Sequence, residues 1–379
     1  MILRNCDIKE FIRRINGKKL VCFGVGKGAD SLSQLFPHYE VEKYFSYIVD
    51  NNSELWGSNR LVGRSLVSIF SPEMLISDAI RTDKLTVLIS STKYADEIIS
   101  HLNTIVELNN AECYISKFII EAEIRKPTHI PNEYRFNTNP VIPKLIHYFW
   151  FGSKPLPERH NQFISGWKEL CPGYDIIEWN INNYDINKFQ YTKDAALAGR
   201  WSKVATYARF DVVYNYGGIC MDTDVEMVKP LDDLLYNTAY IGFGNENRIN
   251  SGSGFGAVKN FEMFNEMREN YDNTLINPDG TQNLLVNSYF ETDFLVKKGL
   301  NPNGDFQIIE NLTVFSSESF SPMPSFIFAE SGVAYATKNT FSVHHYDTSL
   351  KGEEQMKMYT SLTRLFNASV LNEKLFINT

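Results

Sequence analysis

The sequence predicts an α/β protein made of two domains. Short apolar runs alternate with helical patterns over residues 18–118, and a second series of the same kind follows from residue 143. A proline-rich stretch without periodicity separates them at residues 121–141, which we interpret as a linker. A chain of 379 residues accommodates two domains of ordinary size. Strands that alternate with helices are typical of largely parallel sheets.

The first 120 residues predict a small, doubly wound, Rossmann-like domain. Its strands are expected in the apolar runs at residues 18–24, 45–50 and 84–90. A helix is expected after Ser71, which suits the N-cap position, and another over residues 93–110. Helices between successive strands imply parallel pairing.

The second domain is expected to cover residues 142–379, including a helical segment at the C-terminus. Its first strand is predicted in "PKLIHYFWFG", and a helix follows over residues 157–171. Apolar residues at helical spacing over 201–216 end at two glycines, which are typical of a helix stop. "ICM" then reads as a short strand. Ligands of open α/β sheets bind at the carboxyl edge, where this strand ends.

Two carboxylates, Asp222 and Asp224, follow that strand directly. On an extended segment, residues two apart point the same way, so both side chains would face one cavity. Two charges this close favour a cation between them, and oxygen ligands suit Mg²⁺ or Mn²⁺. The alternative is an acidic turn at the surface. The preceding apolar strand and glycine pair favour the cation site.

The composition narrows the classes of partner. A net charge of −8 argues against nucleic acid as a ligand, because phosphate backbones recruit basic surfaces. Five scattered cysteines without a CxxC pattern predict free thiols and a cytoplasmic protein. No apolar run is long enough to span a bilayer. The amphipathic C-terminal segment leaves a peripheral contact with the inner face of the membrane as an alternative to core packing.

Four segments in order, "IPKLIHYFWFG", "CPGYDIIEWN", "ARFDVVYNYGGICMDTDVE" and "SVHHYDTSL", resemble the bacterial DXD-type glycosyltransferases of capsular and surface polysaccharide assembly. These enzymes, of the glycosyltransferase family 32 type, are related to yeast initiating mannosyltransferases. The resemblance covers roughly residues 140–350. It implies a GT-A fold, a nucleotide-sugar donor, a divalent metal (Mn²⁺ or Mg²⁺) and retention of anomeric configuration.

The resemblance assigns catalytic roles to three residues. It implies that Asp222 and Asp224 bridge the metal and the diphosphate, and that Arg209 reaches the donor sugar or phosphate. The alternative for Arg209 is an ion pair with Asp211 on a solvent-facing helix surface. The family usually has an aspartate where this chain has Thr206, so the donor sugar cannot be carried over from relatives.

The resemblance also implies a donor-binding set and a third metal ligand. Phe149, Trp150 and Phe151 end the first strand of the second domain, where an aromatic ring stacks on the nucleotide base. We favour Trp150, and the alternative for each ring is core packing. Gly218 and Ser349 are the other predicted donor-binding residues. His344 is the predicted third metal ligand.

His344 is preferred to its neighbour His345 because its distance to Ser349 matches the family pattern. Leu350 stands where the family has tryptophan. The alternative is a pair of surface histidines on a late strand. We expect His147, which lies inside a strand pattern, to be a core histidine.

The predicted function is transfer of a hexosyl unit from a nucleotide-diphosphate sugar, UDP favoured over GDP, to a surface polysaccharide or a lipid-linked oligosaccharide. Two alternatives stay open. "FGVGKGAD" and the later Asp50 are typical of a dinucleotide site, although the spacing is G-x-G-x-G, so the chain could be an NAD-dependent enzyme that modifies nucleotide sugars. Thr206 and Leu350 leave room for a nucleotide-sugar-binding protein without turnover.

Overall fold

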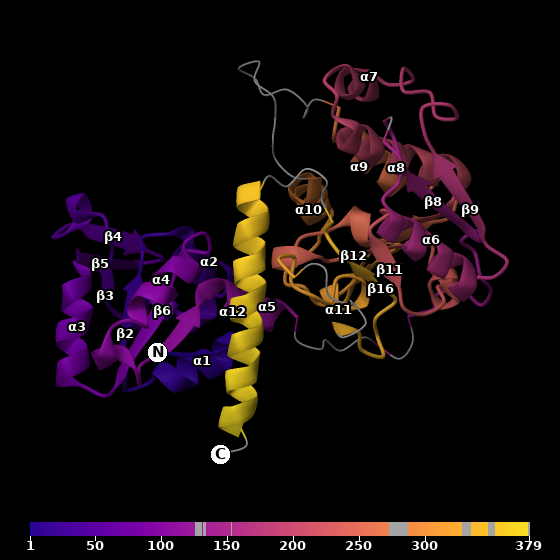
Figure 1. Cartoon of the computed structure of the whole chain (residues 1–379). Helices are drawn as coiled ribbons and strands as arrows, with labels where there is room; N and C mark the ends of the chain where they lie inside the picture. Colours follow the sequence, from indigo (N-terminus) through magenta and orange to yellow (C-terminus); the bar gives the residue numbers. More distant parts are fainter. Residues whose placement is uncertain are drawn as a thin grey trace. The chain divides into compact units, whose positions relative to one another are not determined.

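The chain folds into two compact units in the computed structural model. The first comprises Met1–Ile124 and the C-terminal helix α12 (Glu353–Ile377), and the second extends from Arg125 to Asp347 apart from a short segment at Phe326 (Figure 1). The structure describes residues 1–125, 131, 134–152, 154–272, 287–327, 335–347 and 353–377. Ser349 and Leu350 therefore lie outside the described residues.

The first unit is built on a seven-stranded sheet in the order β1-β7-β6-β2-β3-β5-β4 within the described residues. Neighbouring strands run parallel except in the hairpin β4–β5. The five central parallel strands lie in the spatial order β5-β3-β2-β6-β7. Counted along the chain, this order is third, second, first, fourth and fifth, which is that of a doubly wound sheet. The strands are β1 (Ile2–Leu3), β2 (Lys19–Phe23), β3 (Phe45–Val49), β4 (Asn59–Val62), β5 (Ser65–Phe70), β6 (Leu85–Ile89) and β7 (Glu112–Ile115).

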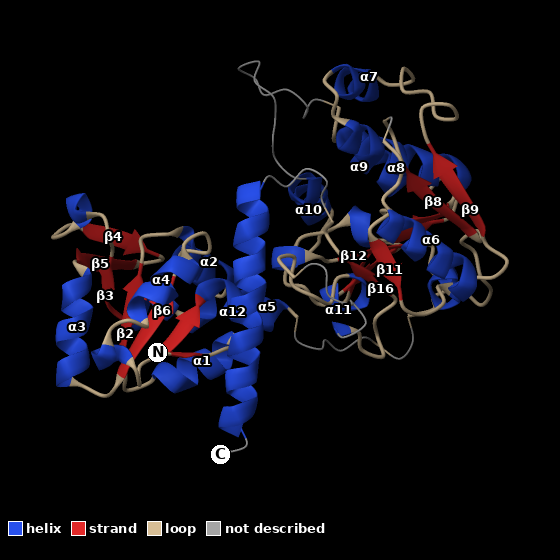
Figure 2. Ribbon diagram, in the orientation of Figure 1, coloured by secondary structure: helices blue, strands red, loops and turns tan. Residues whose placement is uncertain are grey.

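Helices connect these strands, as Figure 2 shows in blue against the red sheet. They are α1 (Ile8–Ile15), α2 (Lys27–Leu35), α3 (Pro72–Arg81), α4 (Ala95–Leu102) and α5 (Ser116–Ile124). The helix expected over residues 93–110 ends at Leu102, and a short 3₁₀ turn follows at Val106–Leu108, in which Leu108 is buried and Val106 is 75% exposed. Helix α5 continues to Ile124, so it occupies the first residues of the predicted linker.

The C-terminal helix α12, yellow in Figure 1, differs from the predicted assignment to the catalytic domain because it packs within the first unit. Its Glu373 carboxylate pairs with Arg14 at 2.9 Å. The ring of Phe366 meets Phe118 of α5 edge-on, with centroids 5.3 Å apart. Charge pairing and aromatic burial against α1 and α5 therefore hold this helix. None of the described helices has the length and apolar character needed to cross a membrane.

The second unit is built on a mixed sheet in the order β14-β15-β12-β13-β10-β8-β9 within the described residues. Strand β8 lies between β9 and β10 and is parallel to both, whereas β13 pairs with β10 in the antiparallel sense. The strands are β8 (Leu145–Phe149), β9 (Asp175–Trp179), β10 (Gly218–Cys220), β12 (Ala239–Gly242), β13 (Phe255–Ala257), β14 (Gln307–Ile309) and β15 (Leu312–Phe315). A separate antiparallel pair joins β11 (Val225–Met227) to β16 (Ser342–His344).

Helices pack around the mixed sheet, and three of them carry Arg159, Arg209 and Glu291, which contact the candidate site. They are α6 (Glu158–Leu170), α7 (Gln190–Leu197), α8 (Trp201–Tyr216), α9 (Glu262–Glu269), α10 (Asn287–Lys297) and α11 (Ser317–Phe320). As predicted, α8 stops at the glycine pair, where Gly217 takes a left-handed φ of 69°. The chain then enters β10 at once, so the sequence order helix, glycines, strand and aspartates becomes one continuous path.

Candidate active site

Asp222 and Asp224 lie in the turn that joins β10 to β11. The backbone N–H of Val225 donates to the carbonyl of Asp222 at 3.2 Å, which closes this turn. The prediction of an extended segment is therefore wrong, and the two side chains are brought together by a turn, not by strand alternation. Strand β11 then pairs with β16, and the register places Val225 opposite His344.

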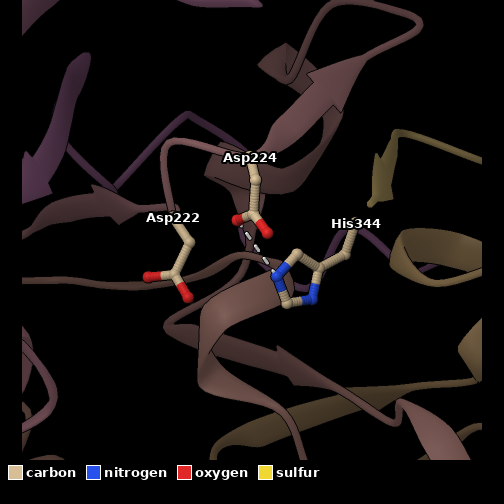
Figure 3. A group of neighbouring side chains, drawn as sticks. All are labelled: Asp222, Asp224 and His344. Carbon is tan, nitrogen blue, oxygen red and sulfur yellow. Dashed lines mark ion pairs between the residues drawn. The ribbon is translucent and has the colours of Figure 1, made fainter. Parts of the chain in front are cut away.

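The three predicted metal ligands come together at this turn. One ligand atom from each of Asp222, Asp224 and His344 lies within 4.8 Å of the others (Figure 3). Nε2 of His344 is 3.2 Å from Oδ1 of Asp224. Asp224 and His344 are each only 7% exposed, whereas the side chain of Asp222 is 36% exposed. One side of the group is thus fixed in the protein interior and the other is open to a ligand.

The pKa values of these three side chains shift in different directions. Burial, together with the neighbouring charge of Asp224, raises the pKa of Asp222, although Arg209 opposes the shift. Burial also disfavours a charge on Asp224, but the imidazole of His344 outweighs it and lowers the pKa of Asp224. Burial alone would lower the pKa of His344, and the Asp224 carboxylate raises it instead.

The chemistry of this donor set fits a divalent cation. Two carboxylates and one imidazole nitrogen are ligands that Mg²⁺ and especially Mn²⁺ accept. Nδ1 of His344 lies 3.2 Å from the amide nitrogen of Asn250 and 3.3 Å from Oγ of Ser253. A cation at Nε2 requires the ring proton to be on Nδ1, where the Ser253 hydroxyl can accept it.

A short segment after β16 fixes the Asp224 carboxylate through a backbone hydrogen bond. The backbone N–H of Asp347 donates to Oδ2 of Asp224 at 2.7 Å, and the Asp347 carboxylate pairs with Arg159 of α6 at 3.0 Å. Nδ1 of His345 accepts from Arg159 at 2.8 Å, and its Nε2 faces Glu226 at 2.8 Å. His345 is therefore occupied by other partners, in keeping with the preference for His344.

Arg209 of α8 points at the aspartate turn. It is 6% exposed, donates from Nη2 to Oδ1 of Asp222 at 2.6 Å and from Nη1 to Oγ of Ser251 at 3.2 Å. The alternative of a solvent-facing pair with Asp211 is wrong. Asp211 is buried and pairs instead with Lys188 and Arg268. Residues two apart on a helix face different sides, which separates Arg209 from Asp211.

A buried glutamate that the sequence did not reveal supports the loop behind Arg209. Glu291 of α10 is 1% exposed and accepts from the backbone N–H and the hydroxyl of Ser251, at 3.0 and 2.6 Å, and from the Tyr271 hydroxyl at 3.0 Å. Burial raises the pKa of Glu291. These bonds fix Ser251, which in turn orients the Arg209 guanidinium toward Asp222.

The same loop approaches Asp222 so closely that a side chain at Gly252 would displace the carboxylate. The N–H of Asp222 donates to the carbonyl of Gly252 at 3.0 Å, and a Cβ at Gly252 would overlap the Asp222 carboxylate. The polar, glycine-rich loop around Ser251 therefore positions one carboxylate of the candidate metal site through its backbone.

We expect Gly252→Ala to reduce activity about a hundredfold without altering any charge, because displacement of a reacting group by about 1 Å has that effect. Steady-state kinetics with the donor sugar would measure it. Gly166→Ala is the matched control: a Cβ there meets no atom within 4 Å, and alanine in the helix should leave activity unchanged. Equal activities for the two variants would show that the close approach has no role.

The structure separates the three aromatic residues predicted to bind the donor. Phe149 and Phe151 are each 9% exposed and pack in the core, where Phe149 stacks on Trp179 with centroids 6.5 Å apart. Their predicted contact with the base is therefore not supported, because both rings pack in the core. Trp150 is partly exposed, and its ring meets His160 edge-on at 6.1 Å.

His160 links that tryptophan to the aspartate turn. Its Nδ1 lies 2.9 Å from Oγ1 of Thr223, the residue between the two aspartates. Of the three rings, Trp150 is thus the one that contacts His160 and through it the aspartate turn. His147, the predicted core histidine, is buried, with Nε2 2.9 Å from the carbonyl of Gly217.

Two further predictions concern Gly218 and Thr206. Gly218 begins β10 and Asp222 follows its end, roughly 13 Å away at strand rise. A Cβ at Gly218 would lie 2.8 Å from Cβ of Leu145, so glycine permits close packing between the strands here, and its donor contact stays a prediction. The Thr206 hydroxyl donates to the carbonyl of Ser202 at 2.9 Å and accepts from the amide of Asn287.

The fold and the site together define an α/β protein whose second unit carries a DXD glycosyltransferase region. Residues 157–241 match the model of the family described as "Glycosyltransferase sugar-binding region containing DXD motif". This segment includes Arg209 and both aspartates of the turn. The predicted class of region is therefore confirmed.

Two curated proteins similar to part of this chain are glycosyltransferases by name. Inositol phosphoceramide mannosyltransferases 1 and 3 of Schizosaccharomyces pombe are 26% and 27% identical, over 26% and 28% of this chain and 33% and 30% of their own length. The chain thus spans about a third of each. A solved structure titled "PaToxG Glycosyltransferase" aligns with 42% of this chain and 69% of its own at 15% identity, with a TM-score of 0.32.

Proposed function

We propose that the chain is a metal-dependent glycosyltransferase whose second unit has a GT-A fold. It would transfer a hexosyl unit from a nucleotide-diphosphate sugar to a surface polysaccharide or lipid-linked oligosaccharide, with retention of configuration. The observation that carries the proposal is the convergence of Asp222 and Asp224, which lie inside the matched region, with His344 of β16, which lies outside it. The mannosyltransferase names of two relatives support a hexose as the transferred unit.

The residues have separate tasks in this proposal. Asp222, Asp224 and His344 would hold Mn²⁺ or Mg²⁺, which supplies positive charge to a departing nucleoside diphosphate. Arg209, always protonated, opposes protonation of Asp222 and orients its carboxylate through their ion pair. Glu291 is committed to Ser251 and Tyr271, so it serves positioning and is not available as a nucleophile.

Trp150 is proposed as the stacking partner of the nucleotide base. It is the partly exposed ring of the aromatic trio and contacts His160, which in turn contacts Thr223. A base there would lie beside the diphosphate end of the donor. UDP is favoured over GDP in the proposal. The location proposed is cytoplasmic, with peripheral membrane contact, in keeping with free thiols at all five cysteines.

Calorimetric titration with UDP and with GDP, each with and without Mn²⁺, tests this function. We expect at least tenfold tighter binding of one nucleotide with metal, or about 1.4 kcal/mol. The metal-dependent gain should grow as pH rises from mildly acidic values, because protons compete for Asp222 and His344, whose pKa values are both raised.

Two results would count against the proposal. Binding of both nucleotides that is indifferent to metal would remove the role of the acidic turn. Metal-dependent binding without any release of nucleotide from a UDP- or GDP-sugar would leave a nucleotide-sugar-binding protein in place of an enzyme.

A further inference from the structure

The first unit contains a cavity that the transfer reaction does not use. It has a volume of about 760 Å³ and lies where β2, β3 and β6 end, at the carboxyl edge of the parallel sheet. Its wall consists of Phe23 to Gly26, Asp50 to Asn52, Ser91 and four residues at the start of α4 and along it. This volume is that of a small-molecule site. Strand β2 lies between β3 and β6, so the crossover connections diverge beside it, at a topological switch point.

Glycines bring the backbone, not side chains, to this cavity. Gly24 takes a φ of 91° after β2, a left-handed conformation that suits glycine. A Cβ at Gly28 would overlap Ser90 and Ser116, so its absence lets α2 start directly against the end of β6. Gly26 lines the cavity and is the N-cap of the nine-residue helix α2 without a side-chain cap, so the start of this helix lies at the cavity edge, although the N–H of Gly28 donates to the Ser90 carbonyl at 3.1 Å.

Asp50, at the end of β3, is held ready to accept hydroxyl groups. Its Oδ2 accepts from the backbone N–H of Val25 at 2.9 Å, and its Oδ1 accepts from that of Asn52 at 2.8 Å. Each carboxylate oxygen has two acceptor positions, so one remains on each. Two fixed acceptors side by side match a vicinal diol such as that of ribose.

The charges of the wall favour a hydroxyl-rich group over an anion at the Asp50 end. Among the described residues that line the cavity, Asp50 and Glu97 are acidic and none is lysine or arginine. A phosphate is therefore better placed at the α2 N-terminus, where backbone dipoles favour negative charge. Tyr94, which lines the cavity and is 48% exposed, offers an aromatic face between the two sides.

We propose that this cavity is a second nucleotide site, independent of the candidate active site. The ribose hydroxyls would be bound by Asp50, and the phosphate by the backbone at the start of α2. The inference does not require the second unit to be a transferase, and it concerns binding without any step of chemistry.

Titration of the full chain with ADP, UDP and NAD in excess EDTA tests the site, because the chelator silences metal-dependent binding in the second unit. We expect at least one of the three to bind, and the pattern among them identifies the base and the second phosphate substituent. Asp50→Asn and His101→Trp should each weaken that binding at least tenfold. The first removes charge from the diol acceptor, and the second fills the cavity from an exposed position on α4.

Matched controls make the outcome decisive. Asp83→Asn, an exposed aspartate outside the cavity, and Asp224→Asn in the candidate active site should both leave the binding unchanged. Should Asp50→Asn disturb the loop, a change in melting temperature will show it, and His101→Trp still gives the answer. Absence of binding by all three nucleotides at millimolar concentration would overturn the inference. So would binding that survives both cavity variants or that is lost in Asp224→Asn.

Discussion

Asp224→Asn is expected to lower turnover of the donor sugar by about a thousandfold while the fold is kept. Loss of one preorganised electrostatic contact in a dry site has effects of this size. Asp224 is the buried member of the pair, so no carboxylate from the protein surface can take its place as a metal ligand. The substituted amide keeps an oxygen for the Asp347 N–H and presents its NH₂ to Nε2 of His344, which explains why the fold should survive.

Release of UDP or GDP from the donor measures this effect, with melting temperature recorded in parallel. Asp175→Asn provides the control, since Asp175 is exposed at the start of β9. It has the same chemistry of substitution in the same unit. Substantial turnover by the Asp224 variant, at wild-type melting temperature, would remove this residue from the metal site.

Arg209→Lys is expected to cost a hundredfold or more in turnover, although the positive charge is retained. The guanidinium reaches Asp222 and Ser251 at the same time from two different nitrogens, and a lysine ammonium cannot reproduce that fork. Asp222 would lose its orientation, and the Ser251 hydroxyl would lose a donor. Because the charge stays, the pKa of Asp222 should change little, and the loss would reflect geometry.

A double-mutant cycle distinguishes this from general damage. If Arg209 acts through Asp222, then Asp222→Asn combined with Arg209→Lys should lose little more than either single variant. Arg13→Lys, at an exposed pair in the first unit, is the control substitution and should be silent. Fully additive losses would mean that Arg209 has a task of its own away from Asp222.

The sequence revealed buried central strands of both units, but it missed the exposed hairpin of the first unit and the place of the C-terminal helix. Runs such as "KLVCF" and "LTVLI" are buried throughout, so their apolar character is the signal. The hairpin β4–β5 has half its residues exposed and gave no comparable run. The place of α12 depends on Arg14 and Phe118, which are hundreds of residues earlier in the chain, and no local pattern reports such partners.

At the site, residues close in sequence could be predicted and their supports could not. The two aspartates and Arg209 lie on one continuous helix–glycine–strand path, and their spacing carried the information. Glu291 accepts hydrogen bonds from Ser251, and Gly252 approaches Asp222. The members of each pair are far apart in sequence, so only the folded chain shows these contacts. Phe149, Trp150 and Phe151 show the reverse error: three adjacent aromatic residues looked alike in sequence, but Phe149 and Phe151 are buried in the core and Trp150 is partly exposed.

Diffraction from crystals soaked with Mn²⁺ and UDP, recorded at the manganese absorption edge, tests the central claim most directly. We predict one anomalous peak at coordination distance, about 2 Å, from carboxylate oxygens of Asp222 and Asp224 and from Nε2 of His344. The diphosphate should occupy the open side next to Asp222. A peak elsewhere in the molecule, with these three side chains still bound only to protein groups, would contradict the account.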